Sequence, residues 1–135
     1  MLRGILETAV YVEDLERSRE FYAALFGFPL MVSDGRFCAF DVAGRDVLLL
    51  FRKGGTPEAV PTPGGLIPAH DGDGRLHLAF AVDRGDLDGW EARLRERKIE
   101  VESRVQWPAG GRSLYFRDPD GHLLELATPG LWRNY

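Results

Sequence analysis

The sequence predicts an α+β fold in which one unit, a strand followed by a helix and further strands, occurs twice. Three observations indicate this fold. Residues 6–12 (LETAVYV) and 76–82 (LHLAFAV) are alike at an offset of 70 residues, a helical apolar stripe follows each of them, and strand-like runs follow each stripe. Because 135 residues suit one compact domain, both copies are expected to belong to a single domain, residues 1–135.

The first copy covers about residues 4–52. Its helix is expected to begin after Asp14, because aspartate caps helix N-termini, and to stop at Gly27. The runs 37–42 (FCAFDV) and 46–51 (DVLLLF) predict the strands that follow. The apolar stripe of the helix consists of Leu15, Phe21, Tyr22, Leu25 and Phe26.

The second copy covers about residues 75–128. Asp86 is expected to cap its helix, whose apolar stripe consists of Leu87, Trp90, Leu94 and Ile99. Residues 53–74, which join the copies, are rich in proline and glycine and are predicted to be irregular, either as a plain linker or as a loop that covers a cavity. The strands of the second copy are predicted at 100–105 (EVESRV), 113–117 (SLYFR) and 123–127 (LLELA).

Composition excludes several classes of partner and site. The chain has 17 Lys and Arg against 21 Asp and Glu, a net charge of −4, so it offers no broad basic field to a nucleic acid. Its one cysteine, Cys38, excludes a disulfide framework and a CxxC zinc site. The apolar runs are too short for a membrane-spanning helix, and the first residues are too charged for a signal peptide, so a cytoplasmic protein without a membrane partner is expected.

Strand alternation suggests where a pocket forms. One side of the first strand carries Glu7, Ala9 and Tyr11, and the same side of the equivalent strand carries His77, Ala79 and Ala81. Small side chains beside an ionisable group leave the space from which pockets are built. The repeat makes Glu7 and His77 equivalent, so a pseudo-twofold arrangement is expected to bring them together.

A third ionisable residue, Glu125, stands alone in the apolar strand at 123–127. It either faces water from an edge strand or serves as a ligand, since an unpaired buried carboxylate is costly. Glu7, His77 and Glu125 together offer one nitrogen and two oxygen donors, which suit a divalent metal with open positions. Mn, Fe(II), Zn, Ni and Co remain open as the metal.

Two motifs resemble the vicinal oxygen chelate superfamily of glyoxalase I, fosfomycin-resistance enzymes, extradiol dioxygenases and bleomycin-binding proteins. They are V-x-D-L-x-x-S-x-x-F-Y-x-x-L-F-G-F from Val12 to Phe28 and S-L-Y-F-R-D-P-D-G-H-L-L-E from Ser113 to Glu125, and the likeness covers about residues 4–130. The resemblance implies paired βαβββ modules forming a curved, cup-like mixed sheet with helices outside. It also places the family's metal ligands at Glu7, His77 and Glu125, and implies a homodimer.

Some positions differ from particular branches of that superfamily. Leu48 stands where glyoxalase I enzymes usually have a fourth ligand. Glu7 and Ala9 replace the histidine and threonine of the fosfomycin enzymes, and no basic cluster for a phosphonate follows Glu125. Dioxygenases typically use two histidines, and Glu7 departs from that pattern too. The resemblance therefore implies the superfamily without selecting a branch.

Further residues have expected roles, each with a plainer alternative. Tyr115 is expected to donate a proton or a hydrogen bond to bound substrate, or else to be a half-buried strand tyrosine. Glu7 is expected to serve both as a metal ligand and as the base that takes a proton from the substrate. Ser113, Tyr11 and Arg117 are candidate substrate contacts, although Tyr11 also suits packing. Alternatively, Arg117 is expected to support the turn near Asp118. His122 is expected at the surface or behind the metal ligands, and His70 is expected to be solvated. The tail 131–135 is expected to pack on a partner chain or over the pocket.

The leading hypothesis is a metal-dependent enzyme that chelates an oxygenated small-molecule substrate and acts as a lyase, isomerase, epimerase, transferase or oxygenase. The alternative is a metal-free protein that binds a drug or metabolite, as the bleomycin-binding relatives do. Intact donors at Glu7, His77 and Glu125 favour the enzyme.

Overall fold

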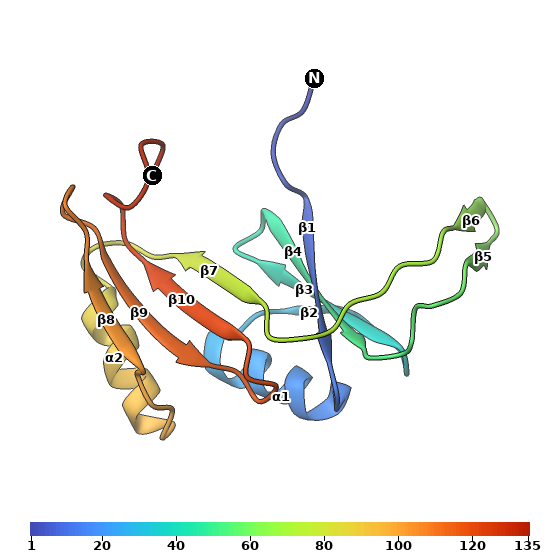
Figure 1. The fold of residues 1–135 in the computed structure, drawn as a ribbon, viewed down its shortest axis with the longest axis horizontal. Helices are drawn as coiled ribbons and strands as arrows, with labels where there is room; N and C mark the ends of the chain where they lie inside the picture. Colours follow the sequence, from blue (N-terminus) through green and yellow to red (C-terminus); the bar gives the residue numbers. More distant parts are fainter. The chain divides into compact units, whose positions relative to one another are not determined.

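The computed structural model describes all 135 residues, which divide into two compact units, Met1–Gly74 and Arg75–Tyr135. Each unit contains one helix and one four-stranded sheet (Figure 1). Both sheets are mixed and open, and both units follow the order βαβββ, which confirms the predicted α+β fold with its repeated unit.

In the first unit, the strand order across the sheet is β1-β4-β3-β2. β1 pairs with β4 in parallel, and the other neighbours are antiparallel. The elements are β1 (Glu7–Val12), α1 (Leu15–Phe26), β2 (Leu30–Ser33), β3 (Phe37–Val42) and β4 (Asp46–Arg52).

The second unit repeats this topology with the order β7-β10-β9-β8 and a parallel pair of β7 and β10. β9 is antiparallel to both β10 and β8. The elements are β7 (His77–Ala81), α2 (Leu87–Glu96), β8 (Ser103–Gln106), β9 (Arg112–Arg117) and β10 (Leu123–Ala127).

The helix ends follow the sequence signals in α1 but only partly in α2. The Asp14 carboxylate accepts a hydrogen bond of 3.0 Å from the Arg17 N–H, and Gly27 ends α1 in the left-handed region at a φ of 72°. Asp86 also precedes its helix, but it has helical backbone angles and its side chain makes no capping hydrogen bond. Asp86 therefore stands at the predicted N-terminal position of α2, but the predicted capping by its side chain is wrong.

Each unit has its own core between its helix and one face of its sheet. In the first unit Tyr22 and Leu25 of α1 are buried with Val10, Phe40 and Leu50 of the sheet. Burial of one such side chain contributes about 1.5–3 kcal/mol relative to exposure. In the second unit the equivalent buried side chains are Leu87, Leu94, Leu114, Phe116, Leu124 and Leu126. The opposite face of each sheet is left to carry the polar residues discussed below.

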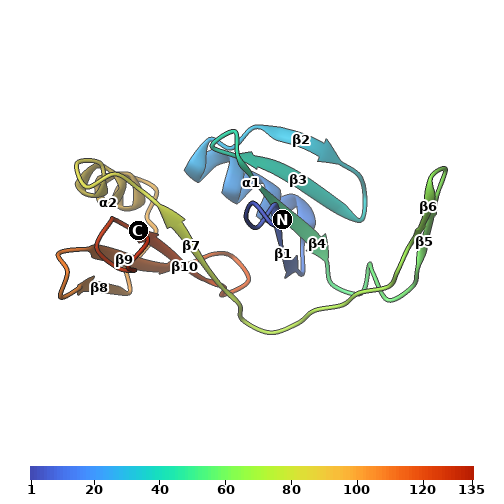
Figure 2. The same ribbon diagram turned by 90° about the horizontal axis from the view of Figure 1, so that it is seen from above.

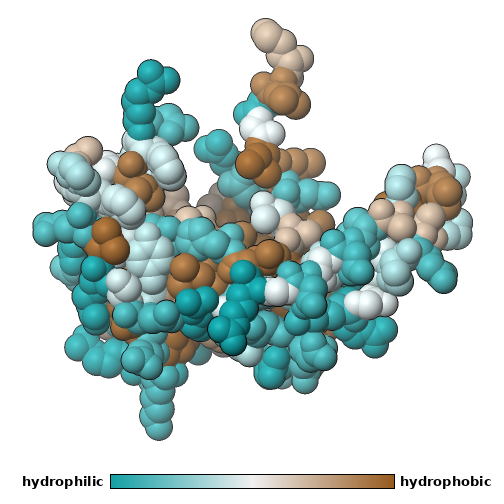
Figure 3. Space-filling model, viewed as in Figure 1, coloured by the Kyte–Doolittle hydropathy of each residue, from teal (hydrophilic) through white to brown (hydrophobic).

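The predicted linker at 53–74 contains regular structure that the sequence did not reveal. β5 (Val60–Thr62) and β6 (Gly65–Ile67) pair as a short antiparallel hairpin, drawn in green in Figure 2. Pro61 lies within β5, which is tolerated because β5 has a partner on one side only. Leu66 and Ile67 are exposed on this hairpin, whose surface is partly brown in Figure 3.

Three smaller differences concern strand ends and the tail. β2 was not predicted, because its four residues are all exposed and a bulge interrupts its register between Leu30 and Val32. β8 begins at Ser103, later than the predicted 100. In the tail, the Tyr135 hydroxyl donates to the carbonyls of Val82 and Ala127, so this end packs on its own unit. No helix of the structure is long and apolar enough to cross a membrane.

Candidate functional site

His77 and Glu125 lie side by side on the open face of the second sheet. His77 begins β7, and Glu125 lies in the middle of the neighbouring strand β10. The His77 Nε2 atom is 3.2 Å from Glu125 Oε2. The imidazole is 49% exposed and the carboxylate only 5%, so the pair is accessible from the histidine side.

The tautomer of His77 follows from its second contact. Its Nδ1 atom is 2.9 Å from the Leu123 carbonyl oxygen, which can only accept a hydrogen bond. Nδ1 therefore carries the proton, and in the neutral ring Nε2 presents a lone pair toward Glu125 Oε2. Two acceptors that face each other need a proton or a cation between them. A histidine whose other nitrogen donates to a backbone carbonyl is the usual arrangement of a metal ligand.

The second oxygen of Glu125 is already engaged. The Ser113 hydroxyl donates to Glu125 Oε1 at 2.5 Å, and the Trp107 indole N–H donates to Ser113 Oγ at 2.8 Å. Glu125 is 3% exposed, and no buried side-chain N or O atom lacks a hydrogen-bond partner. The carboxylate is thus oriented by Ser113 with Oε2 turned toward His77.

Tyr115 completes the group on this face. It is the residue of β9 directly opposite Glu125, and its ring stacks with that of His77 at a centroid distance of 6.3 Å. Burial raises the pKa of Tyr115, and the hydrogen bond and charge of Glu125 raise it further. The phenol is therefore held protonated, and its proton is donated to Glu125.

Two other residues of this unit have different surroundings from those expected. Arg117 makes a two-pronged ion pair with Glu102, at 2.8 and 3.1 Å, and donates to the Gly121 carbonyl, so its ionic partner is Glu102 and not Asp118. His122 is fully buried, which makes the expected surface position wrong. Its Nδ1 accepts the Leu76 N–H at 2.9 Å and so holds the residue next to His77.

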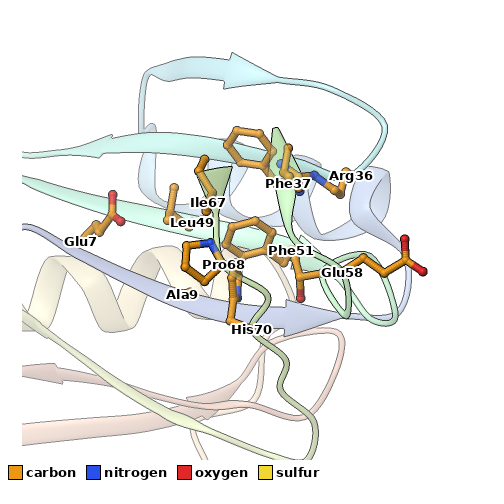
Figure 4. Close-up of a pocket in the computed structure, with 12 residues that line it drawn as sticks. Glu7, Ala9, Arg36, Phe37, Leu49, Phe51, Glu58, Ile67, Pro68 and His70 are labelled. Carbon is orange, nitrogen blue, oxygen red and sulfur yellow. The ribbon is translucent and has the colours of Figure 1, made fainter. Parts of the chain in front are cut away.

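Glu7 lies in the first unit, at the start of β1. It is exposed, and it lines a pocket of about 460 Å³ together with residues of β3, β4 and the segment 56–70 (Figure 4). Tyr11, which lies four residues after Glu7 on the same face of β1, is only 5% exposed. The Tyr11 hydroxyl bonds to Thr56 Oγ1 at 2.9 Å and to His70 Nδ1, so Tyr11 packs beneath that segment.

Sequence reasoning missed most of this pocket. His70 is exposed, as expected of a solvated histidine, but its ring also lies edge-on to Phe51 at a centroid distance of 4.9 Å and lines the pocket. The alternation in β3 and β4 places Phe37, Leu49 and Phe51 on the face of Glu7, which was a readable signal. No local pattern marked the way in which His70 and Pro68 fold over that face.

The donor atoms of this site fit a divalent metal in their chemistry. Within the second unit they are the imidazole of His77 and the carboxylate of Glu125, and two neighbouring ligands that each lie about 2.1 Å from one ion are roughly 3 Å apart. Glu7 supplies a further exposed carboxylate in the first unit. Neither unit by itself gathers three His, Cys, Asp or Glu side chains around one point.

Comparisons with known proteins identify the family. The family model "Glyoxalase/Bleomycin resistance protein/Dioxygenase superfamily" matches residues 4–126. A metallothiol transferase FosB of Lysinibacillus sphaericus is 31% identical over 119 residues, which are 87% of this chain and 76% of that protein. A FosB of Staphylococcus epidermidis is 28% identical and covers 97% of this chain and 87% of its own.

Solved structures agree with the sequence relatives. The crystal structure of lactoylglutathione lyase from Agrobacterium tumefaciens has a TM-score of 0.87 and 34% identity, over 96% of both chains. The fosfomycin resistance protein FosX from Listeria monocytogenes has a TM-score of 0.71 and covers 97% of both chains, and at 23% identity it shows the shared fold. The chain therefore belongs to the glyoxalase/bleomycin resistance protein/dioxygenase superfamily, also called the vicinal oxygen chelate superfamily.

Proposed function

We propose that this protein is a metal-dependent enzyme that binds an oxygenated small-molecule substrate, with Glu7, His77 and Glu125 as the metal ligands. The observation that carries the proposal is the His77–Glu125 pair. The Leu123 carbonyl accepts from His77 Nδ1, and the Ser113 hydroxyl donates to Glu125 Oε1. The remaining atoms, His77 Nε2 and Glu125 Oε2, face each other. An arrangement that fixes two lone pairs at 3.2 Å suits a cation better than an ordinary surface contact does.

The chain's own residues have defined tasks in such a reaction. The metal, drawn from Mn, Fe(II), Zn, Ni or Co, would act as a Lewis acid toward substrate oxygens. Tyr115 keeps its proton because burial and Glu125 raise its pKa, and on substrate binding it exchanges its hydrogen bond to Glu125 for one to a substrate oxygen on the face of His77. Glu7 is exposed at the start of β1 and accepts a proton from the substrate as the base.

The relatives support an enzyme and narrow its chemistry. They are a metallothiol transferase, which catalyses a group transfer, and a lactoylglutathione lyase. Both names are compatible with a reaction that starts from a polarised substrate oxygen. Leu48 of this chain offers no donor atom, so a fourth protein ligand in that part of the first unit is not proposed. We further propose a cytoplasmic homodimer, as the family resemblance implies.

Metal analysis tests the proposal directly. The full-length protein is purified without chelator, and its metal content per chain is measured for the wild type and for His77→Ala, Glu125→Gln, Glu7→Gln and the control Glu58→Gln. Glu58 is an exposed carboxylate near the same pocket and is not a proposed ligand.

We expect the wild type and Glu58→Gln to hold metal and each ligand variant to lose affinity, because a ligand contributes several kcal/mol to binding. A wild type that takes up none of Mn²⁺, Fe²⁺, Zn²⁺, Ni²⁺ and Co²⁺ would overturn the enzyme proposal and leave the metal-free binding protein. Retention of metal by Glu7→Gln alone would remove Glu7 from the ligand set and keep the other two.

A further inference from the structure

The face of the first sheet that carries Glu7 is built in three rows. The strand register aligns every second residue of β1, β4 and β3 across the sheet. The first row has an acidic residue at each end (Glu7, Val47, Asp41), the middle row has an alanine at each end (Ala9, Leu49, Ala39), and the third row is aromatic (Tyr11, Phe51, Phe37). Because an alanine side chain ends at Cβ, the middle row leaves open space above the sheet. Figure 4 shows Ala9, Leu49 and Phe51 beneath that space, with Glu7 at one end.

The segment 56–72 forms a roof over the aromatic row. The Tyr11 hydroxyl is bonded to Thr56 and His70, and the His70 N–H donates to the Thr56 carbonyl at 3.1 Å. Gly72 lies directly over the Tyr11 ring, so close that a Cβ there would be 2.4 Å from Cδ2. The roof is therefore fastened at this end, and the remaining space of about 460 Å³ is a defined pocket within the size range of small-molecule sites.

The lining of the pocket indicates the chemistry of its ligand. The walls are apolar, and Phe37 and Phe51 are stacked at 5.4 Å in the floor. Arg36 is the one Lys or Arg side chain that lines the pocket, and its guanidinium already lies 5.6 Å from the centre of the Phe37 ring. Glu7 and Glu58 add negative charge. A multiply charged anion is therefore disfavoured here, whereas a flat apolar ring matches the floor.

We infer that this pocket holds an aromatic ring system of one or two rings that forms the hydrophobic part of the substrate, with the substrate's oxygens toward Glu7. The identification of this ligand as a substrate rests on the proposed function. The preference of the pocket for an aromatic ring rests only on residues 1–74.

Calorimetric titration of the full-length protein tests the inference, both as purified and after removal of metal. The probes are 2-naphthol, cyclohexanol and phosphonoacetate, which represent an aromatic, an aliphatic and a multiply charged ligand. We expect 2-naphthol to bind most tightly with and without metal, because the ring contacts do not involve the metal. Equal or tighter binding of cyclohexanol would overturn the aromatic preference, and tightest binding of phosphonoacetate would overturn the apolar pocket.

A matched pair of variants locates the binding. Ala9→Leu fills the floor of the pocket, whereas Ala23→Leu makes the same change on the exposed surface of α1. We expect the affinity for 2-naphthol to fall roughly tenfold or more in Ala9→Leu, as a misfitting methylene group discriminates in apolar pockets, and to stay unchanged in Ala23→Leu. Unchanged affinity in Ala9→Leu would place the binding elsewhere and refute the inference.

Two further measurements distinguish a failure of the pocket inference from a failure of the enzyme proposal. Ile67 is half-exposed on the hairpin, so Ile67→Ser removes part of the wall without a core defect, and it should also weaken 2-naphthol binding if Ala9→Leu does not fold. Metal content is measured on every variant. A wild type that holds metal but does not bind 2-naphthol would refute the pocket inference alone, whereas a wild type that binds 2-naphthol but holds no metal would refute the enzyme proposal alone.

Discussion

The Ser113 hydroxyl donates a 2.5 Å hydrogen bond to Glu125 Oε1, since an ionised carboxylate can only accept. The Trp107 indole N–H donates to Ser113 Oγ and so holds that hydroxyl in place beside the carboxylate. Trp107 thereby acts on Glu125 through Ser113, and it is a positioning residue for the proposed metal site.

Trp107→Phe keeps an aromatic ring but removes the donor, which frees the Ser113 hydroxyl to rotate away from Glu125. We expect roughly tenfold weaker metal binding, as for other groups that orient a ligand, measured by competition with a coloured chelator. Trp90→Phe is the control, because Trp90 lies on α2 and contacts Arg93. Equal metal affinity in both variants would show that the indole N–H does not position Glu125.

Tyr115 should ionise at a higher pH than an ordinary tyrosine. Burial comes first among the causes that raise its pKa, followed by the hydrogen bond and charge of Glu125. Because the folded-state pKa is above the unfolded value, the resulting stability is present at neutral pH and is lost as the pH rises through the folded pKa. Ultraviolet titration of phenolate should show a late component that disappears in Tyr115→Phe.

The same titration separates the causes. Glu125→Gln removes the charge and leaves the burial, so the pKa of Tyr115 should fall but stay above the ordinary value. Burial also raises the pKa of Tyr135, so Tyr135→Phe is needed as the reference background. An ordinary tyrosine pKa at Tyr115 would contradict the arrangement of Ser113, Tyr115 and Glu125 described here.

Cys38 should react very slowly with thiol reagents. It is fully buried in β3, and burial raises the pKa of its thiol from 9.0 to about 11. Two pKa units make the thiolate about 100-fold rarer at neutral pH, since the thiolate is the reactive form. Labelling with an aromatic disulfide should therefore proceed fully in denaturant and be slower by about that factor or more in the folded protein. Rapid labelling of the folded protein would mean that β3 opens readily.

Gly72 should be intolerant of even one added methyl group. A Cβ there would lie 2.4 Å from the Tyr11 ring, so Gly72→Ala must displace the roof segment, at a cost of about 1–3 kcal/mol in the free energy of unfolding. Gly89→Ala is the matched control, because Gly89 lies in α2 with nothing near its Cβ, and it should stabilise the protein by up to about 0.5–1 kcal/mol. Denaturant unfolding measures both, and equal effects would contradict the close packing on Tyr11.

The two helices, most of the strands and the donor residues were readable because they depend on local patterns. The repeat of 6–12 at 76–82 predicted equivalent strands, and each occupies the same place in its sheet, beside the last strand of its βαβββ unit. Glu125 stood out because a lone carboxylate in an apolar strand needs a partner, and the structure gives it His77 and Ser113.

Other features were hidden because no local pattern encodes them. The hairpin of β5 and β6 contains Pro61, a residue that argues against a strand unless the strand is at an edge. For His122 the sequence left a surface position and a position behind the metal ligands open, and its burial was decided by the Leu76 N–H, which its Nδ1 accepts from a residue 46 positions away. Arg117 pairs with Glu102, which directly precedes the neighbouring strand β8, and the pairing of β8 with β9 brings these two residues together.

By itself, the sequence determined the α+β class, the repeated unit and the chemical types of the donor side chains, because helix caps, strand alternation and residue chemistry act over a few residues. The tertiary structure decided the orientation of Glu125 by Ser113, the burial of Tyr11 under His70, and the pocket above Ala9. These depend on which distant segments pack together, and packing of distant segments is settled by the free energy of the whole fold and not by any short stretch of sequence.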